Sequence, residues 1–197
     1  MKKEEQVYIN FRNTVFIIGI SVVGFAIQML CAAPFAPFPF VLAFISQPLS
    51  TMVTGSLFVL IMMKAPYRGT ILLFSALFAF PFLFMGTPIV SVIFMLGGLL
   101  GELVFVNNNT RTKIKITISY AIFALSIGLG TYVPVLFTKE ALLSNLVNQG
   151  VSQTIIDNYD TLYTAGPITI GCILTLIASI IGTMIGFKIF KKHFAKV

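Results

Sequence analysis

The sequence predicts an all-α membrane protein: a six-helix transmembrane bundle with both chain ends in the cytoplasm and short extracellular helices between spans five and six. Two observations lead to this prediction. Hydrophobic residues make up 57% of the 197 residues and charged residues 10%, whereas about a quarter of the residues in soluble domains are charged. In addition, nearly all lysines and arginines fall on one side of the predicted spans.

Six apolar segments approach or exceed the length of about 20 residues that a helix needs to cross a bilayer. The predicted spans are 14–33, 41–63, 70–85, 88–106, 114–137 and 165–187. The third is short and contains Pro81, and only Gly86 and Thr87 separate it from the fourth. We therefore expect spans three and four to form a tight helical hairpin.

The positions of the basic residues predict the orientation, because lysine and arginine are retained in the cytoplasm during membrane insertion. Of the 13 lysines and arginines, only Lys139 lies in a loop on the other side. We therefore expect a cytoplasmic segment at 1–13, a membrane domain at 14–190 and a basic cytoplasmic tail at 191–197. The net charge of +7 is then a topology signal and does not indicate nucleic-acid binding. The expected location is a bacterial cell membrane, crossed several times.

Residues that support catalysis or metal binding are scarce. The single histidine, His193, lies in the basic tail, and the glycines of 97–101 lack the strand and the lysine of a phosphate-binding loop. Cys31 and Cys172 are expected to be small packing residues. We therefore expect no enzyme activity, no cofactor and no metal.

The extracellular side is expected to carry the binding function. The segment after span one is rich in proline and phenylalanine, and Phe35 and Phe38 could form either an interfacial aromatic belt or one wall of a ligand pocket. The loop at 138–164 has apolar residues at helical spacing on both sides of Gly150. It is expected to form two short amphipathic helices that act as a lid or a binding element.

Polar side chains in the outer halves of the spans must face the bundle interior or a cavity. The candidate substrate-binding residues combine such side chains with aromatic rings and with carboxylates of the outer loop. They are Gln28, Phe35, Phe38, Gln47, Tyr132, Asp157, Tyr159, Asp160 and Tyr163. The only outer cation, Lys139, has Glu140 beside it to offset its charge. This set suits a neutral or cationic flat heterocycle.

Glu102 is the only acidic residue in a predicted span. It could be a proton-coupling carboxylate, or it could pair with Lys64, Arg68 or Arg111 near the cytoplasmic surface.

Two pairs of glycines are spaced four residues apart, Gly97 with Gly101 and Gly182 with Gly186. This spacing allows close helix contact, either inside the bundle or with a partner helix.

Several short motifs resemble the Trep_Strep group of substrate-binding S components of energy-coupling-factor (ECF) vitamin transporters. They are Gly69 after Lys64 and Arg68, the stretch at 97–103, Gly130 and Pro134 around Tyr132, and the ending at 191–196. The resemblance implies a subunit that binds a vitamin-like micronutrient from outside and docks on a transmembrane coupling protein carrying two ATPases. It also implies docking through small residues of span one, here Gly19 and Gly24, although the usual Ala-x-x-x-Ala pattern is missing.

Two other functions remain open at this stage. A stand-alone secondary carrier would normally show inverted repeats or several intramembrane charges, and neither is evident. A non-transporting membrane assembly subunit would not need polar residues such as Gln28, Gln47 and Tyr132 near its outer end.

Overall fold

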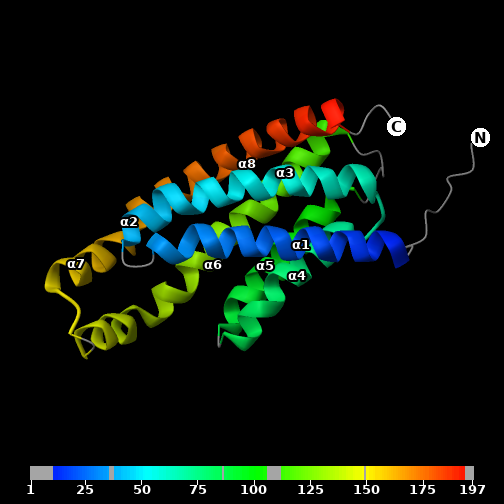
Figure 1. Ribbon diagram of the computed structural model, residues 1–197. Coiled ribbons are helices and arrows are strands. Elements are labelled where there is room, and N and C mark those ends of the chain that lie inside the picture. The colour runs from blue at the N-terminus through cyan, green and yellow to red at the C-terminus, as the bar shows by residue number, and fades with distance from the viewer. Residues whose placement is uncertain (1–10, 36–37, 86, 106–111, 149, 194–197) are drawn as a thin grey trace, which may run out of the picture.

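The computed structural model describes residues 11–35, 38–85, 87–105, 112–148 and 150–193. In these ranges the regular structure is entirely helical (Figure 1). The elements are α1 (Phe11–Ala32), η1 (Ala33–Phe35), α2 (Pro39–Val41), the π-helical η2 (Leu42–Ser46), α3 (Gln47–Lys64), α4 (Thr70–Phe84), α5 (Pro88–Leu103), α6 (Lys113–Asn148), α7 (Gln153–Leu162) and α8 (Ala165–His193).

The apolar helices lie where the sequence predicts them, which confirms the all-α fold for the described residues. Four segments are long and apolar enough to cross a membrane: Phe11–Phe35, Leu42–Lys64, Lys113–Val133 and Ala165–His193. The helices α4 and α5 are apolar but shorter, with 15 and 16 residues. They pack along each other as expected for a hairpin.

The most extensive helix contact joins α3 and α8, which run in the same direction. A side chain at Gly182 would collide with the backbone of Met52, and one at Gly186 would collide with Ser56. The Ser56 hydroxyl donates a hydrogen bond of 3.0 Å to the carbonyl oxygen of Gly182. This glycine pair therefore allows close packing inside the bundle.

The second glycine motif has the same role in α5. The side chain of Ser126 in α6 occupies the space beside Gly97, and that of Ser75 in α4 occupies the space beside Gly98. In this structure the motif packs α5 between α4 and α6.

The core changes character along the bundle. Its largest part is a cluster of buried aromatic rings with neighbouring centroids 4.6–6.4 Å apart: Phe58, Phe74, Phe78, Phe94, Tyr120 and Phe123. A smaller cluster lies toward α7 and contains Ala43, Tyr132 and Leu162. Between the two clusters, α3 buries the polar residues Gln47, Ser50, Thr51 and Thr54.

Helix α6 is longer than the sequence predicts. The expected break after residue 137 is absent, and α6 continues to Asn148, so α7 is the only separate short helix in the described part of the outer loop. The residues from Thr138 to Asn148 include no glycine or proline, and Gly150 follows with a φ of +71°.

Figure 1 shows the end of α6 bending away from the bundle beside α7. Pro134 lies inside α6 and gives a physical reason for the bend.

The described basic residues gather at one end of the bundle, which we call the basic end. The start of α1, the end of α3, the start of α6 and the end of α8 lie there (Figure 1). Its basic residues are Arg12, Lys64, Arg68, Lys113, Lys115, Lys188, Lys191 and Lys192. Lys139 lies at the opposite end, beside α7, which we call the outer end. Lys2, Lys3, Arg111 and Lys196 lie outside the described residues.

Candidate functional site

The outer end buries three of the polar residues that the sequence singles out. Gln28 of α1, Gln47 of α3 and Tyr132 of α6 are 7%, 7% and 1% exposed. Gln28 shares the inner face of α1 with Gly24, on the side packed against α3 and α4. The side chain of Tyr132 points from α6 toward α8, where it lies beside Gly171.

Gln47 follows a rare backbone feature. The preceding residues form the π-helical turn η2, in which the Gln47 N–H donates to the carbonyl oxygen of Leu42. Pro48 comes next, and a proline ring collides with the preceding turn of a regular α-helix, so the wider π turn makes room for it. The backbone oxygen of Gln47 accepts bonds from the Ser50 and Thr51 hydroxyls at 2.9 and 2.8 Å. Its side-chain Nε2, by contrast, is buried without a hydrogen-bond partner.

The hydroxyl of Tyr132 is the second buried polar atom without a partner among the described side chains. It lies against Gly171 of α8, at the position that a β-carbon would occupy. The ring packs in the cluster with Ala43 and Leu162. Ala43 lies four residues before Gln47, so η2 connects this cluster along the chain to the residue with the unpaired amide.

Other buried polar groups in the bundle do have partners. The Tyr120 hydroxyl, also on α6, donates to the carbonyl oxygen of Thr51 at 2.7 Å and lies 2.6 Å from the Thr54 hydroxyl. The Thr175 hydroxyl donates to the carbonyl oxygen of Gly171 at 2.8 Å. Buried polar groups are normally bonded in this way, so the atoms of Gln47 and Tyr132 require an explanation.

Helix α7 brings aromatic residues to the same end. Leu162 is buried in the small cluster, and Tyr163 packs against it. The rings of Tyr159 and Tyr163 are stacked, with centroids 6.2 Å apart. Burial raises the pKa of Tyr163 to about 12 and also raises the pKa of Tyr159.

The carboxylates of α7 are engaged at the surface. Asp160 forms an ion pair of 2.8 Å with Lys139, whose Nζ also donates to the Asp160 carbonyl oxygen at 3.0 Å. Asp157 accepts a bond of 2.9 Å from Gln153 on the same exposed face. The partner of Lys139 is therefore Asp160 and not its neighbour Glu140.

Phe35 and Phe38 remain at the surface, 37% and 59% exposed. The rings that pack against the small cluster are Phe40 and Phe44, with centroids 5.9 Å apart. Neither residue is among the predicted binding residues, although their spacing of four residues places them on one helical face. Gly171, which makes room for the Tyr132 hydroxyl, is not among the predicted residues either.

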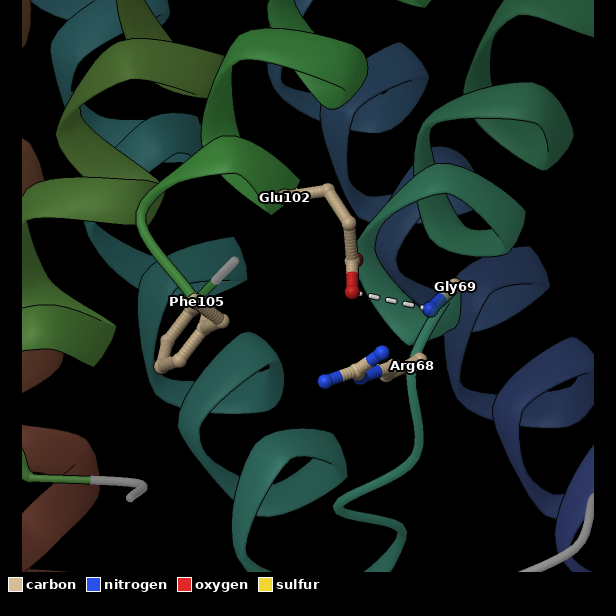
Figure 2. A pocket seen from close by; sticks show the side chains of 4 residues that line it. All are labelled: Arg68, Gly69, Glu102 and Phe105. Carbon is tan, nitrogen blue, oxygen red and sulfur yellow. Dashed lines mark hydrogen bonds between the residues drawn. The ribbon is translucent and has the colours of Figure 1, made fainter. Parts of the chain in front are cut away.

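Glu102 has a structural role at the basic end (Figure 2). Its carboxylate accepts bonds from the backbone N–H of Gly69 at 2.8 Å and of Ile71 at 3.2 Å, so it caps the first turn of α4. A negative charge is favourable at the amino end of a helix. Arg68 and Phe105 line the same pocket of about 130 Å³. One of the two alternatives for Glu102 was an ion pair with Lys64, Arg68 or Arg111. Its ion pair with Lys64 or Arg68 is absent within the described residues, where Lys139–Asp160 is the ion pair found, and Arg111 lies outside them.

The two glycines assigned to docking differ in position. Gly19 faces outward on α1, and a side chain there would meet no atom within 4 Å. Gly24 is buried, and a side chain there would contact the Phe78 ring at 3.1 Å and Thr54 at 3.6 Å. The outward face of α1 contains Gly19 together with Val15 and Val22, whereas Gly24 belongs to the bundle interior.

Large apolar side chains lie on the outside of the described helices. Examples are Val22, Leu96 and Ile177, which are 58%, 53% and 50% exposed. Apolar surface this extensive is typical of a protein surrounded by lipid. Together with the membrane-length helices, this apolar surface defines an integral membrane protein.

Residues 11–196 match the model of the family Trep_Strep, described as "hypothetical bacterial integral membrane protein", and the chain belongs to this family. Neither the curated proteins nor the solved structures contain a match.

Proposed function

We propose that the chain is the membrane-embedded substrate-binding subunit of an ECF-type importer. It binds a vitamin-like micronutrient at its outer end and then docks on a transmembrane coupling protein carrying two ATPases. In this proposal the basic end faces the cytoplasm, in agreement with the retention of positive residues on that side.

The observation that carries the proposal is the pair of buried, unpartnered polar atoms, Gln47 Nε2 and Tyr132 Oη. Leaving a buried donor without an acceptor costs about 1–3 kcal/mol, and such a cost is expected where a ligand completes the bonds. The aromatic rings of Phe40, Phe44 and Tyr163 beside Tyr132 suit a flat molecule. A structural assembly subunit would gain nothing from these two unpaired groups.

Docking is proposed for the outward face of α1 around Gly19. Helices in lipid associate through close packing, which small residues permit. Because a side chain at Gly19 meets no atom of the described residues within 4 Å, its replacement should leave the bundle intact.

Transport assays test the function directly. Liposomes containing the chain with its coupling protein and ATPases should accumulate the micronutrient only when ATP is supplied, and liposomes containing the chain alone should not accumulate it. Accumulation by the chain alone, driven by an ion gradient, would instead identify a secondary carrier.

The docking face is tested by co-purification with the coupling protein. Gly19→Leu should reduce recovery of the complex, whereas Gly166→Leu, at an equally open position in α8, should not. Normal assembly of both variants would place docking on another face.

The orientation in the membrane is tested by cysteine labelling. A cysteine introduced at Ser152 should react with an impermeant reagent added outside, and one introduced at Lys192 should not.

A further inference from the structure

We propose that the outer-end site takes an uncharged molecule that presents hydrogen-bond acceptors to Gln47 Nε2 and Tyr132 Oη. This inference rests on the proposed function, because it names the class of substrate for the same site. Both atoms can act as donors, and Gln47 Nε2 can only donate, so an acceptor on the ligand completes the amide.

The placement of the outer charges supports an uncharged ligand. Lys139 and Asp160 neutralise each other through an ion pair of 2.8 Å, and the Lys139 Nζ also donates to the backbone carbonyl oxygen of Asp160 at 3.0 Å. Asp157 bonds with Gln153 on the exposed face of α7, and Glu140 is exposed. A buried charge needs a partner of opposite sign, and these contacts hold Lys139 and the carboxylates of the outer end at the surface.

The surroundings of the two donors are apolar or already bonded. Ala43 and Leu162 pack against the Tyr132 ring, while the Ser50 and Thr51 hydroxyls bond with the backbone oxygen of Gln47. A ligand in contact with both donors is therefore recognised by its acceptors and its apolar surface. This arrangement favours a neutral ring with carbonyl groups over a carboxylate, a phosphate or an ammonium ion.

The first test uses two tyrosines of the same helix. Tyr120 and Tyr132 are both fully buried on α6, but only Tyr120 has hydrogen-bond partners. In ligand-free, detergent-solubilised protein, Tyr120→Phe should lower the unfolding temperature by several degrees, whereas Tyr132→Phe should leave it unchanged or raise it. An equal loss in both variants would show that the Tyr132 hydroxyl is bonded within the protein and would overturn the proposal.

The second test compares three probes of the same shape and different charge: benzamide, benzoate and benzamidine. At equal concentration, benzamide should raise the unfolding temperature of the wild-type protein most. Gln47→Leu should weaken benzamide binding about tenfold, which corresponds to about 1.4 kcal/mol. Gln153→Leu, which removes an exposed amide of α7, is the matched control and should bind benzamide normally.

The outcomes separate this inference from the proposed function. A shift that is larger for benzoate or benzamidine, equal for all three probes, or absent for all three would overturn the uncharged ligand class. The importer function would still stand if ATP-dependent uptake were observed with a charged micronutrient. Conversely, benzamide binding that depends on Gln47, together with no ATP-dependent uptake, would keep the ligand class and overturn the importer.

Discussion

Removal of the Glu102 carboxylate should loosen the first turn of α4. In Glu102→Ala the backbone N–H groups of Gly69 and Ile71 lose their acceptors, and the amino end of the helix loses a favourable charge. Loss of a helix cap costs about 0.5–2 kcal/mol, and bonds to charged groups contribute about 1.5–3 kcal/mol. Because Glu102 is half-buried beside an open pocket, water can replace it in part, and we expect a loss of about 2 kcal/mol.

The assay is thermal unfolding in detergent with matched variants. For a chain of this size, about 2 kcal/mol lowers the unfolding temperature by about 4–8 °C. Glu102→Gln should lose about half as much, because its amide oxygen can accept only one of the two N–H groups well. Glu140→Ala removes the same charge from an exposed position at the outer end and should have little effect.

A double-mutant cycle with Arg68 separates the helix cap from an ion pair. If the carboxylate acts as a cap, Glu102→Ala should cost about the same with Arg68→Ala present as without it. A cost that disappears in the Arg68→Ala background would refute the capping explanation. Unchanged hydrogen exchange of the Gly69 and Ile71 amides in Glu102→Ala would refute it as well.

Three further predictions concern a turn, a helix contact and a tyrosine. Gly69→Ala should lose about 1–2 kcal/mol in thermal unfolding, because φ is +84° there although the space is open; Gly166→Ala is the control. Gly182→Ala should lose about 3 kcal/mol or fail to fold, because its β-carbon meets the Met52 backbone; normal stability would refute the close contact. Tyr163 should ionise at about pH 12 instead of 10.0 in absorbance titrations. Since the unfolded chain releases this proton first, stability should fall from about pH 10 to 12, and this fall should be smaller in Tyr163→Phe.

The apolar helices could be predicted from the sequence because membrane spans are encoded locally, by length and hydropathy. The predicted end of α6, at residue 137, was wrong for a local reason as well. The polar residues after Phe137 suggested a loop, but Thr138 to Asn148 include no glycine or proline to stop the helix. Polarity indicates where a chain leaves the membrane, whereas the end of a helix requires a specific backbone signal.

Contacts between distant residues were harder to predict. The burial of Gln47 and Tyr132 follows from the cost of polar groups in lipid, and the structure places both inside the bundle. The cap at Glu102 joins it to amides 33 and 31 residues away, and Asp160 bonds with a lysine 21 residues away. Nothing in the local sequence specifies these partners, because they depend on how the helices pack.

The two ends of the bundle are held together in different ways, and this difference bears on ligand entry. At the basic end, Glu102 fixes α4 to α5, and Gly186 allows the backbones of α3 and α8 to approach closely. At the outer end, Gln47 and Tyr132 leave donors unpaired, and the ion pair that joins α6 to α7 is partly exposed. Exposed ion pairs contribute little stability, and unpaired buried donors reduce it. Local opening should therefore require least free energy around η2 and α7, where a molecule from outside would enter. Hydrogen exchange measures this directly: amides of α7 should exchange faster than those of α3, and slower exchange in α7 would contradict the proposed entry route.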